Sequence, residues 1–305
     1  MLAALDLGSN SFHMLIAERV NGSFEVVERF SEKVQLGEGV ATTGNISDQA
    51  MSRAMSCLVN FRQHIDNHPV TALSVVGTKT FRTASNVAPL LLHAEQLGFT
   101  IETISGEREA ELIYRGVSFA LPSDEQPRMV FDIGGGSTEF AQGIDHKPFL
   151  LRSLNVGCVS WRDRFFASGK IDKDDFKTAV VAAREHIYMC RHELTAVTCK
   201  RVYASSGTAK MLSTIAREME FSDGSLTQDV LKMIRDVTFG FDKVEQVELP
   251  GLKASRQSVL LPGLAIMTAV VKELDIGKVL HSKTALREGL LLELLHGGGQ
   301  QASLL

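Results

Sequence analysis

The sequence has little of what marks several large classes of protein. Its 305 residues include only four cysteines, without Cys-x-x-Cys spacing or a disulfide-dense pattern, and no signal-peptide pattern stands at the N-terminus. A reducing cytoplasm is therefore expected. The net charge of −4 provides no general field that would attract nucleic acid. No charge-free run of about eighteen apolar residues occurs, so no membrane span is expected.

The composition that remains is that of an ordinary globular protein, with 44% hydrophobic and 22% charged residues. A chain of 305 residues is usually divided into two domains. The polar break from Pro122 to Pro127 is the best candidate boundary. We therefore expect domain I over residues 1–121 and domain II over residues 122–305, with a closing helix over 285–295 that could pack back on domain I.

Two short stretches share one pattern, in which an apolar run ends in an Asp that is followed by glycine, a hydroxyl residue and a second apolar run. The first contains Asp6, Gly8, Ser9 and Asn10, and the second contains Asp132, Gly134, Gly135, Gly136, Ser137, Thr138 and Glu139. Each predicts a turn between two strands. Glycine lets the backbone approach a ligand, and successive N–H groups in such a turn can hold an anion. The first stretch alone is more often a plain hairpin turn, but the pair predicts a duplicated phosphate-binding site.

The acidic residue in each stretch indicates a metal ion. A carboxylate beside a phosphate repels it unless a cation lies between them, so Asp6 and Asp132 predict Mg²⁺, which binds carboxylates, water and phosphate oxygens. Neither stretch is a Walker loop or a dinucleotide fingerprint, because a strand rather than a helix is expected to follow and no Gly-Lys-Ser/Thr occurs.

The expected elements repeat in one order on the two sides of the break. Before it we expect strands over 2–7, 12–20 and 24–34, a loop over 37–44, a helix capped by Ser47, a strand over 70–77, a helix over 86–97, a strand over 99–104 and a helix over 107–119. After it we expect strands over 128–133, 138–143 and 148–154, a helix over 157–167, a long helix capped by Asp172, a strand over 200–204, helices beginning near Ala209 and after Thr227, a helix over 256–274 and a strand over 278–281. The tail from Gly297 is expected to be disordered. This order predicts two α/β domains of similar topology with a ligand cleft between them.

Further motifs complete a resemblance to a known family. They are Leu36-Gly37-Glu38-Gly39, the Arg82 loop, Ser105-Gly106-Glu107-Arg108-Glu109-Ala110, Ser205-Ser206-Gly207-Thr208, Leu261-Pro262-Gly263-Leu264-Ala265 and Ala285-Leu286-Arg287-Glu288-Gly289. With the two phosphate stretches, and over about residues 1–295, the chain resembles the exopolyphosphatase/guanosine pentaphosphate phosphohydrolase family of the actin–Hsp70–sugar kinase superfamily. The resemblance implies a two-domain, actin-like (ribonuclease H-like) fold and hydrolysis of a terminal phosphoanhydride. Lys283-Thr284 departs from the family's usual Asp-Gly or Gly-Gly, which leaves the details of the nearby pocket open.

The resemblance also implies roles for individual residues. Glu109 would orient or deprotonate the attacking water, and Arg82 would contact phosphate. Asp132 and Glu139 would associate with Mg²⁺ directly or through water, with Asp6 assisting. The implied phosphate-binding residues are Gly8, Ser9, Asn10, Gly134, Gly135, Gly136, Ser137, Thr138, Gly207, Thr208 and Lys210. Without the resemblance, Glu109 would be interpreted as a carboxylate that suits the first turn of a helix, and Arg82 and Lys210 as solvated side chains.

Two substrates stay open, because inorganic polyphosphate and guanosine pentaphosphate both end in a phosphoanhydride; a slight preference for polyphosphate rests on Lys210. A sugar kinase, an actin-like structural protein and a non-catalytic phosphate sensor are the alternatives from other classes. The combination of Glu109, Asp132 and Glu139 argues against the sensor. The histidines at 64, 68, 186 and 192 are expected to be structural rather than zinc ligands. A homodimer is expected from the resemblance alone.

Overall fold

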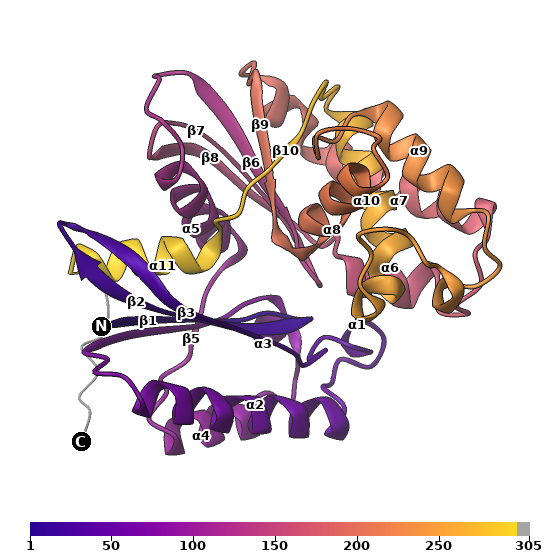
Figure 1. Cartoon of the computed structure of the whole chain (residues 1–305). Helices are drawn as coiled ribbons and strands as arrows, with labels where there is room; N and C mark the ends of the chain where they lie inside the picture. Colours follow the sequence, from indigo (N-terminus) through magenta and orange to yellow (C-terminus); the bar gives the residue numbers. More distant parts are fainter. Residues whose placement is uncertain (298–305) are drawn as a thin grey trace.

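The computed structural model describes residues 1–297 and shows two α/β halves with one topology (Figure 1). The first sheet has the strand order β3-β2-β1-β4-β5, and the second has the order β10-β9-β6-β7-β8. When the second sheet is followed from β8 to β10, its strands correspond one by one to those of the first sheet followed from β3 to β5. Each sheet is an antiparallel three-stranded meander that two parallel strands extend. The predicted fold class and the repeat of topology are confirmed.

The first half follows the hydrophobic pattern of the sequence closely. It contains β1 (Leu2–Leu7), β2 (Ser11–Val20), β3 (Ser23–Lys33), α1 (Val40–Thr43), α2 (Asp48–Asp66), β4 (Ala72–Gly77), α3 (Lys79–Thr83), α4 (Ala88–Gln96), β5 (Glu102–Thr103) and α5 (Gly106–Phe119). The three meander strands agree with the prediction to within one residue. Ser47 caps α2 as expected, because its side chain accepts a hydrogen bond from the backbone N–H of Ala50.

Three local predictions for the first half were wrong. The expected loop over 37–44 contains α1, a single turn bounded by Gly39 and Gly44, which both have φ of 72°. Arg82 lies in the five-residue helix α3 rather than in a loop. The strand expected over 99–104 is reduced to β5. Elements this short contain too few residues to show a hydrophobic period. Tertiary contacts, rather than the local sequence pattern, therefore determine whether they form.

The second half contains β6 (Pro127–Ile133), β7 (Thr138–Ile144), β8 (Lys147–Leu154), α6 (Cys158–Phe165), α7 (Lys173–Thr195), β9 (Arg201–Ser205), α8 (Ser206–Glu218), α9 (Gln228–Thr238), η1 (Val244–Gln246), η2 (Ala254–Val259), α10 (Leu260–Glu273), β10 (Leu280–His281) and α11 (Leu286–Leu295). Asp172 caps α7 and Thr227 caps α9, as expected. The prediction that α8 begins near Ala209 was wrong, since it begins at Ser206 and includes Gly207 and Thr208 in its first turn.

One helix in the described part of the chain is apolar enough to be compared with a membrane span. The segment Ala254–Glu273, made of η2 and α10, passes by length and composition, but 67% of its most apolar window is buried inside the protein. It packs against α6, α7, α8 and α9. We therefore describe it as the core helix of the second half. The tail that was expected to be disordered lies, beyond Gly297, outside the described residues.

Two helices lie between the sheets and connect the halves. α5 follows the first sheet in the chain but packs on β6, β7 and β8 of the second, whereas α11 ends the second half and packs on β1 to β4 of the first. Figure 1 shows α11, in yellow, lying along the indigo sheet. One buried apolar cluster contains residues from both sheets and both helices. The boundary at residues 122–127 therefore separates the sheets, while the helices are exchanged across it.

Candidate active site

The two phosphate stretches form the first turn of each meander, and these turns face each other. A Cβ atom placed on Gly135 would lie 3.1 Å from the Cβ of Ser9, and one on Gly136 would lie 3.1 Å from the Ser9 Oγ. Ser9 is 5% exposed, and its Oγ accepts a hydrogen bond of 2.8 Å from Thr80 Oγ1. The glycines thus allow a close approach that side chains would prevent. The structure brings together the two turns that the sequence paired.

The second turn is fixed by the start of α6. The N–H of Cys158 donates to the carbonyl of Gly134 at 2.9 Å, and that of Val159 donates to Gly135 at 2.8 Å. Thr138 is 1% exposed, and its hydroxyl donates to the carbonyl of Val156 at 2.6 Å. Because a threonine hydroxyl has one proton, that proton is already engaged, and Thr138 braces the turn.

Four carboxylates converge at these turns. Asp6 is the penultimate residue of β1, Asp132 lies near the end of β6 opposite Glu139 on β7, and Glu109 lies in the first turn of α5. Burial raises the pKa of Asp6 to about 7, and the charge of Asp132 adds to the rise. Burial raises the pKa of Asp132 to about 6 and that of Glu139 to about 7. These mutual effects show that the acidic groups predicted from separate motifs share one site.

Glu109 is held by Arg82, the other residue to which the family resemblance gave a catalytic role. Its side chain is almost fully buried, and Oε2 accepts a hydrogen bond of 3.1 Å from Nη1 of Arg82. The same Nη1 donates to the carbonyl of Ile104 at 2.6 Å, which fixes the guanidinium. Burial, followed by the charge of Glu139, raises the pKa of Glu109 well above its usual range, and Arg82 opposes that rise. Glu109 is therefore a fixed carboxylate with an increased affinity for a proton.

Two of the other three cleft carboxylates have serine partners that sequence reasoning missed. Ser205 donates to Oδ2 of Asp132 at 2.6 Å, and Ser153 donates to Oε1 of Glu139 at 2.8 Å. A Cβ atom on Gly106, the first residue of α5, would collide with Ser153. Ser153 thus links the second sheet to the start of the helix that carries Glu109. The pairing of Glu139 with Ser153 across β7 and β8 could have been found from the register of the meander.

Cationic side chains from distant parts of the chain surround the carboxylates. Arg287 acts on the pKa of both Asp6 and Asp132 and lowers each of them. Lys79 donates to Oδ1 of Asn155 at 2.5 Å and so connects α3 with the second half. Sequence reasoning did not assign a role to Arg287, although it lies within the motif Ala285–Gly289 that supported the resemblance.

The third predicted loop is the beginning of α8. Thr208 is 2% exposed, and its hydroxyl donates to the carbonyl of Ile133 at 3.0 Å. Gly207 lies under Arg256, because a Cβ there would be 2.5 Å from the guanidinium carbon. Lys210 is exposed on α8, and its charge acts on His281 rather than on the carboxylates. The structure therefore brings Gly207 and Thr208 to the second turn and leaves Lys210 at the surface.

The donor set limits how a metal could be bound. In residues 1–297, no group of three or more His, Cys, Asp and Glu side chains is arranged to hold a metal ion. Asp6, Asp132 and Glu139 hence do not form a complete protein ligand set.

His64 and His68 are joined by a contact of 2.9 Å between His68 Nδ1 and the His64 carbonyl, at the end of α2.

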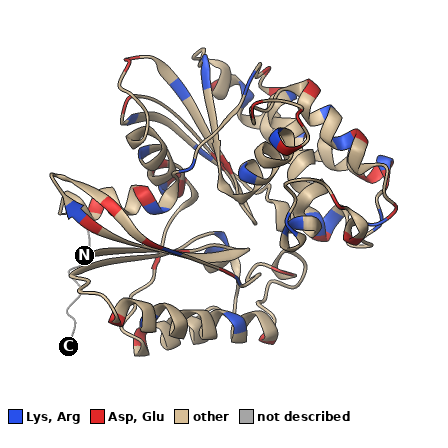
Figure 2. Ribbon diagram, in the orientation of Figure 1, with Lys and Arg blue, Asp and Glu red and all other residues tan. Residues whose placement is uncertain are grey.

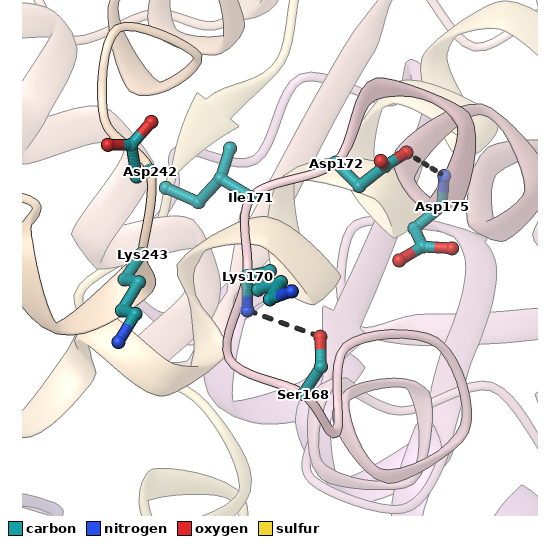
Figure 3. Close-up of a pocket in the computed structure, with 7 residues that line it drawn as sticks. All are labelled: Ser168, Lys170, Ile171, Asp172, Asp175, Asp242 and Lys243. Carbon is teal, nitrogen blue, oxygen red and sulfur yellow. Dashed lines mark hydrogen bonds between the residues drawn. The ribbon is translucent and has the colours of Figure 1, made fainter.

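A separate hollow lies between the end of α6 and the start of α7. Its volume is about 350 Å³, and its lining residues are Ser168, Lys170, Ile171, Asp172, Asp175, Asp242 and Lys243. Figure 3 shows Asp172 and Ser168 bonded to backbone N–H groups of their own segment. None of the cleft carboxylates lines this hollow, so the candidate active site is the meeting point of the two turns.

Comparisons with known proteins agree with this fold. A model of the Ppx/GppA phosphatase family matches residues 15–297. An exopolyphosphatase from Cytophaga hutchinsonii ATCC 33406 has 26% identity and a TM-score of 0.88, with 98% of this chain and 99% of that one covered. The Ppx/GppA family member from Aquifex aeolicus has 24% identity and a TM-score of 0.78 over 98% of this chain and 99% of that one. The family match spans α5, the second turn and α11, and on it the chain belongs to the Ppx/GppA phosphatase family.

Proposed function

We propose that the protein is a Mg²⁺-dependent hydrolase that releases the terminal phosphate from inorganic polyphosphate. The observation that carries the proposal is the convergence of four carboxylates, two buried and two partly buried, on two facing turns, with Glu109 held by Arg82. Family membership supports phosphatase activity. The similarity to an exopolyphosphatase supports the choice of polyphosphate.

Glu109 is the proposed general base. The reaction requires water to attack a phosphorus atom whose oxygens are negative, so catalysis depends on positioning and charge neutralisation. A carboxylate with a raised pKa accepts the proton of an attacking water more readily than an ordinary Glu does. Arg82 keeps Glu109 in one orientation and has further N–H groups for the phosphoryl oxygens, which match a guanidinium in geometry.

The two turns are the proposed grip on the phosphates. Backbone N–H groups around Gly8 to Asn10 and Gly134 to Ser137 lie where the turns meet, and such groups form concave sites for anions. Lys79 lies against Gly136 and adds a positive charge on one side. Arg287 adds another beside Asp6. The terminal phosphate would thus be surrounded by donors from both halves of the molecule.

The chemistry of the carboxylates fits Mg²⁺. Burial raises the pKa of Asp6 and of Glu139, the charge of Asp132 adds to both rises, and a cation among the three carboxylates would relieve that repulsion. Mg²⁺ is usually bound by one or two carboxylates with waters and substrate phosphate oxygens. The lack of a three-residue ligand group in the described part of the chain agrees with that mode. Asp132 and Glu139, with Asp6 opposite, would hold the ion, which would neutralise charge on the phosphoryl oxygens.

The direct test is a phosphate-release assay on inorganic polyphosphate, with guanosine pentaphosphate as the second substrate. We expect release from polyphosphate that requires Mg²⁺ and stops with a chelator. Preferred release from guanosine pentaphosphate would replace the proposed substrate and keep the chemistry.

A matched pair of variants tests the base. Glu109→Gln should preserve the fold and reduce kcat by about 10²–10⁴-fold, the usual contribution of general-base catalysis. Glu107→Gln, an exposed position in the same helical turn, should retain normal turnover. Normal turnover by Glu109→Gln would refute its assignment as the base.

A further inference from the structure

We propose that Lys33, Arg53, Arg162 and Arg256 form a second anion subsite, which binds phosphate groups of a linear polyphosphate beyond those at the carboxylates. We call these four residues the outer basic cluster. The proposal rests on the proposed function and adds to it, because it assigns the path of a long substrate rather than the chemistry at its end.

The outer basic cluster is assembled from both halves. Lys33 ends β3 opposite Ser11, directly beside the first turn, and Arg53 lies on α2. Arg162 lies on α6, and Arg256 covers Gly207 at the start of α8. Figure 2 shows Lys and Arg positions on both α2 and α6. Arg53 donates to the carbonyl of Val34, the residue after Lys33, and η2, which carries Arg256, packs on α6, which carries Arg162. In agreement with these contacts, the charges of Arg162 and Arg256 lower the pKa of Lys33, after burial as the largest cause.

The cluster has more positive charge than its acidic partners neutralise. Glu38 lies 3.6 Å from Arg53 and 3.5 Å from Arg162, and Asp163 lies 2.6 Å from Arg162. Four cations against two carboxylates leave a surplus of two positive charges, in a chain whose net charge is −4. Within residues 1–297, neither Lys33 nor Arg256 forms an ion pair.

One donor in the cluster makes no hydrogen bond. Nη2 of Arg53 is buried and lies 3.6 Å from Oε2 of Glu38, which is an ion-pair distance but too long for a hydrogen bond, while Nε of the same side chain donates to the carbonyl of Val34 at 2.7 Å. The backbone bond fixes the guanidinium and leaves Nη2 able to donate to a closer acceptor. A phosphate oxygen is such an acceptor, and a guanidinium binds it strongly.

The cluster is continuous with the candidate active site. Arg256 covers Gly207, and the next residue, Thr208, donates to the carbonyl of Ile133 at the start of the second turn. Arg256 therefore lies beside the candidate active site, and after burial the charges of Arg287 and Arg256 lower the pKa of His13, the cross-strand partner of Asp6. A linear chain of phosphates, which has negative charge along its whole length, matches this arrangement. Tripolyphosphate is short enough to be bound mainly at the reacting end.

A latch between the halves is the competing explanation. The contact of Glu38 with Arg162 and the hydrogen bond of 3.2 Å from the Gly39 N–H to Asp163 both join the first half to α6. If Arg162 acted only as a latch, removing either partner of its ion pair would weaken substrate binding. If Arg162 binds phosphate, removing Glu38 would free it and reduce repulsion of the substrate. The two explanations thus predict opposite signs for Glu38→Gln.

The binding experiment uses calorimetry of long-chain polyphosphate with full-length Glu109→Gln protein, in which turnover is blocked. Adding Arg162→Gln or Arg53→Gln should each weaken binding by about tenfold, the effect expected for losing a hydrogen bond to a charged group. Adding Glu38→Gln should tighten it. Arg164→Gln is the control, since Arg164 is exposed on the same helix and lies over the ring of Phe165 instead. Unchanged binding in both arginine variants, or weaker binding with Glu38→Gln, would overturn the subsite.

The kinetic experiment places the subsite along the substrate. In the otherwise native protein, Arg162→Gln should raise KM for long-chain polyphosphate about tenfold and KM for tripolyphosphate much less. An equal rise for both would place Arg162 at the reacting phosphates and overturn the proposal. If the native protein releases phosphate from neither substrate, the proposed function fails, whereas the calorimetry still decides whether the cluster binds polyphosphate.

Discussion

Gly116→Ala should push apart the two helices that connect the halves of the molecule. Gly116 lies in α5 where it crosses α11, and a Cβ there would lie 2.8 Å from the backbone nitrogen of Gly289 and closer still to the carbonyl oxygen of Ala285. Ordinary contacts of such an atom begin at 3.4 Å. The obstacle is backbone on a packed helix, so no side chain can rotate to make room. The added methyl group must therefore displace α11 or α5.

Two opposing terms set the size of the effect. Alanine is favoured over glycine inside a helix by about 1 kcal/mol, so the variant would be more stable if nothing obstructed the methyl group. Overpacking of a core costs about 1–3 kcal/mol and occasionally more. A backbone clash at a helix crossing belongs at the upper end, and we expect a net loss of about 2 kcal/mol in the free energy of unfolding. At about 2–4 °C per kcal/mol, Tm should fall by roughly 4–8 °C.

Differential scanning calorimetry of Gly116→Ala beside Gly277→Ala measures this effect. Gly277 has open space around its Cβ position and no positive φ, so its variant controls for the chemical change alone. Because α5 also carries Glu109, the displaced helix should lower kcat/KM as well. A Gly116→Ala protein as stable as Gly277→Ala would refute the reasoning about the crossing.

Three other predictions concern the carboxylates. Because burial raises the pKa of Glu109 and Arg82 opposes the rise, the acidic limb of the kcat/KM profile should lie above the ordinary Glu range of about 4.3 and move to higher pH in Arg82→Gln. Burial raises the pKa of Asp6 from 3.8 to about 7, so the folded protein binds a proton at Asp6 more tightly than the unfolded chain does. In metal-free protein, the resulting contribution to the free energy of unfolding is fully present below about pH 4 and is lost as the pH rises through 7. Asp6→Asn should abolish that part of the decline in thermal melts across this range, and an unchanged pH dependence would contradict the assignment. Ser153→Ala removes the 2.8 Å hydrogen bond to Glu139 and should lower kcat/KM by about tenfold with little change in Tm; wild-type kinetics would show that the bond does not position the carboxylate.

The meanders and the caps could be predicted because their signals are local. Nearly continuous apolar runs mark β1 and most of β2, and alternating exposure is confined to β3. Ser47, Asp172 and Thr227 each precede a helix and accept hydrogen bonds from its N–H groups. The two glycine-containing turns were predicted for the same reason. The pairing of these turns with Glu109 and Arg82 came from the family resemblance.

The remaining parts of the site depend on contacts between residues far apart in the chain. Arg287 and Ser205 approach Asp132 only after the second sheet and α11 have formed. The short helix that carries Arg82 is set by its place after β4, since five residues cannot make a stable helix alone. The packing of α5 on the second sheet has no signature in the helix itself, because an apolar face does not specify which sheet covers it.

Because α11 packs on the first sheet, the first half of the protein cannot complete its folding until the end of the chain has been synthesised. The face of the first sheet that includes Leu2, Ala4 and Leu15 belongs to the buried cluster that α11 completes with Leu290 and Leu291. That face emerges early from the ribosome, and its cover is made almost three hundred residues later. At about 5–20 residues per second, the interval is roughly a quarter of a minute to a minute. The apolar residues of that face lack the cover of α11 throughout that time, and transiently exposed apolar surface of this kind is prone to aggregation.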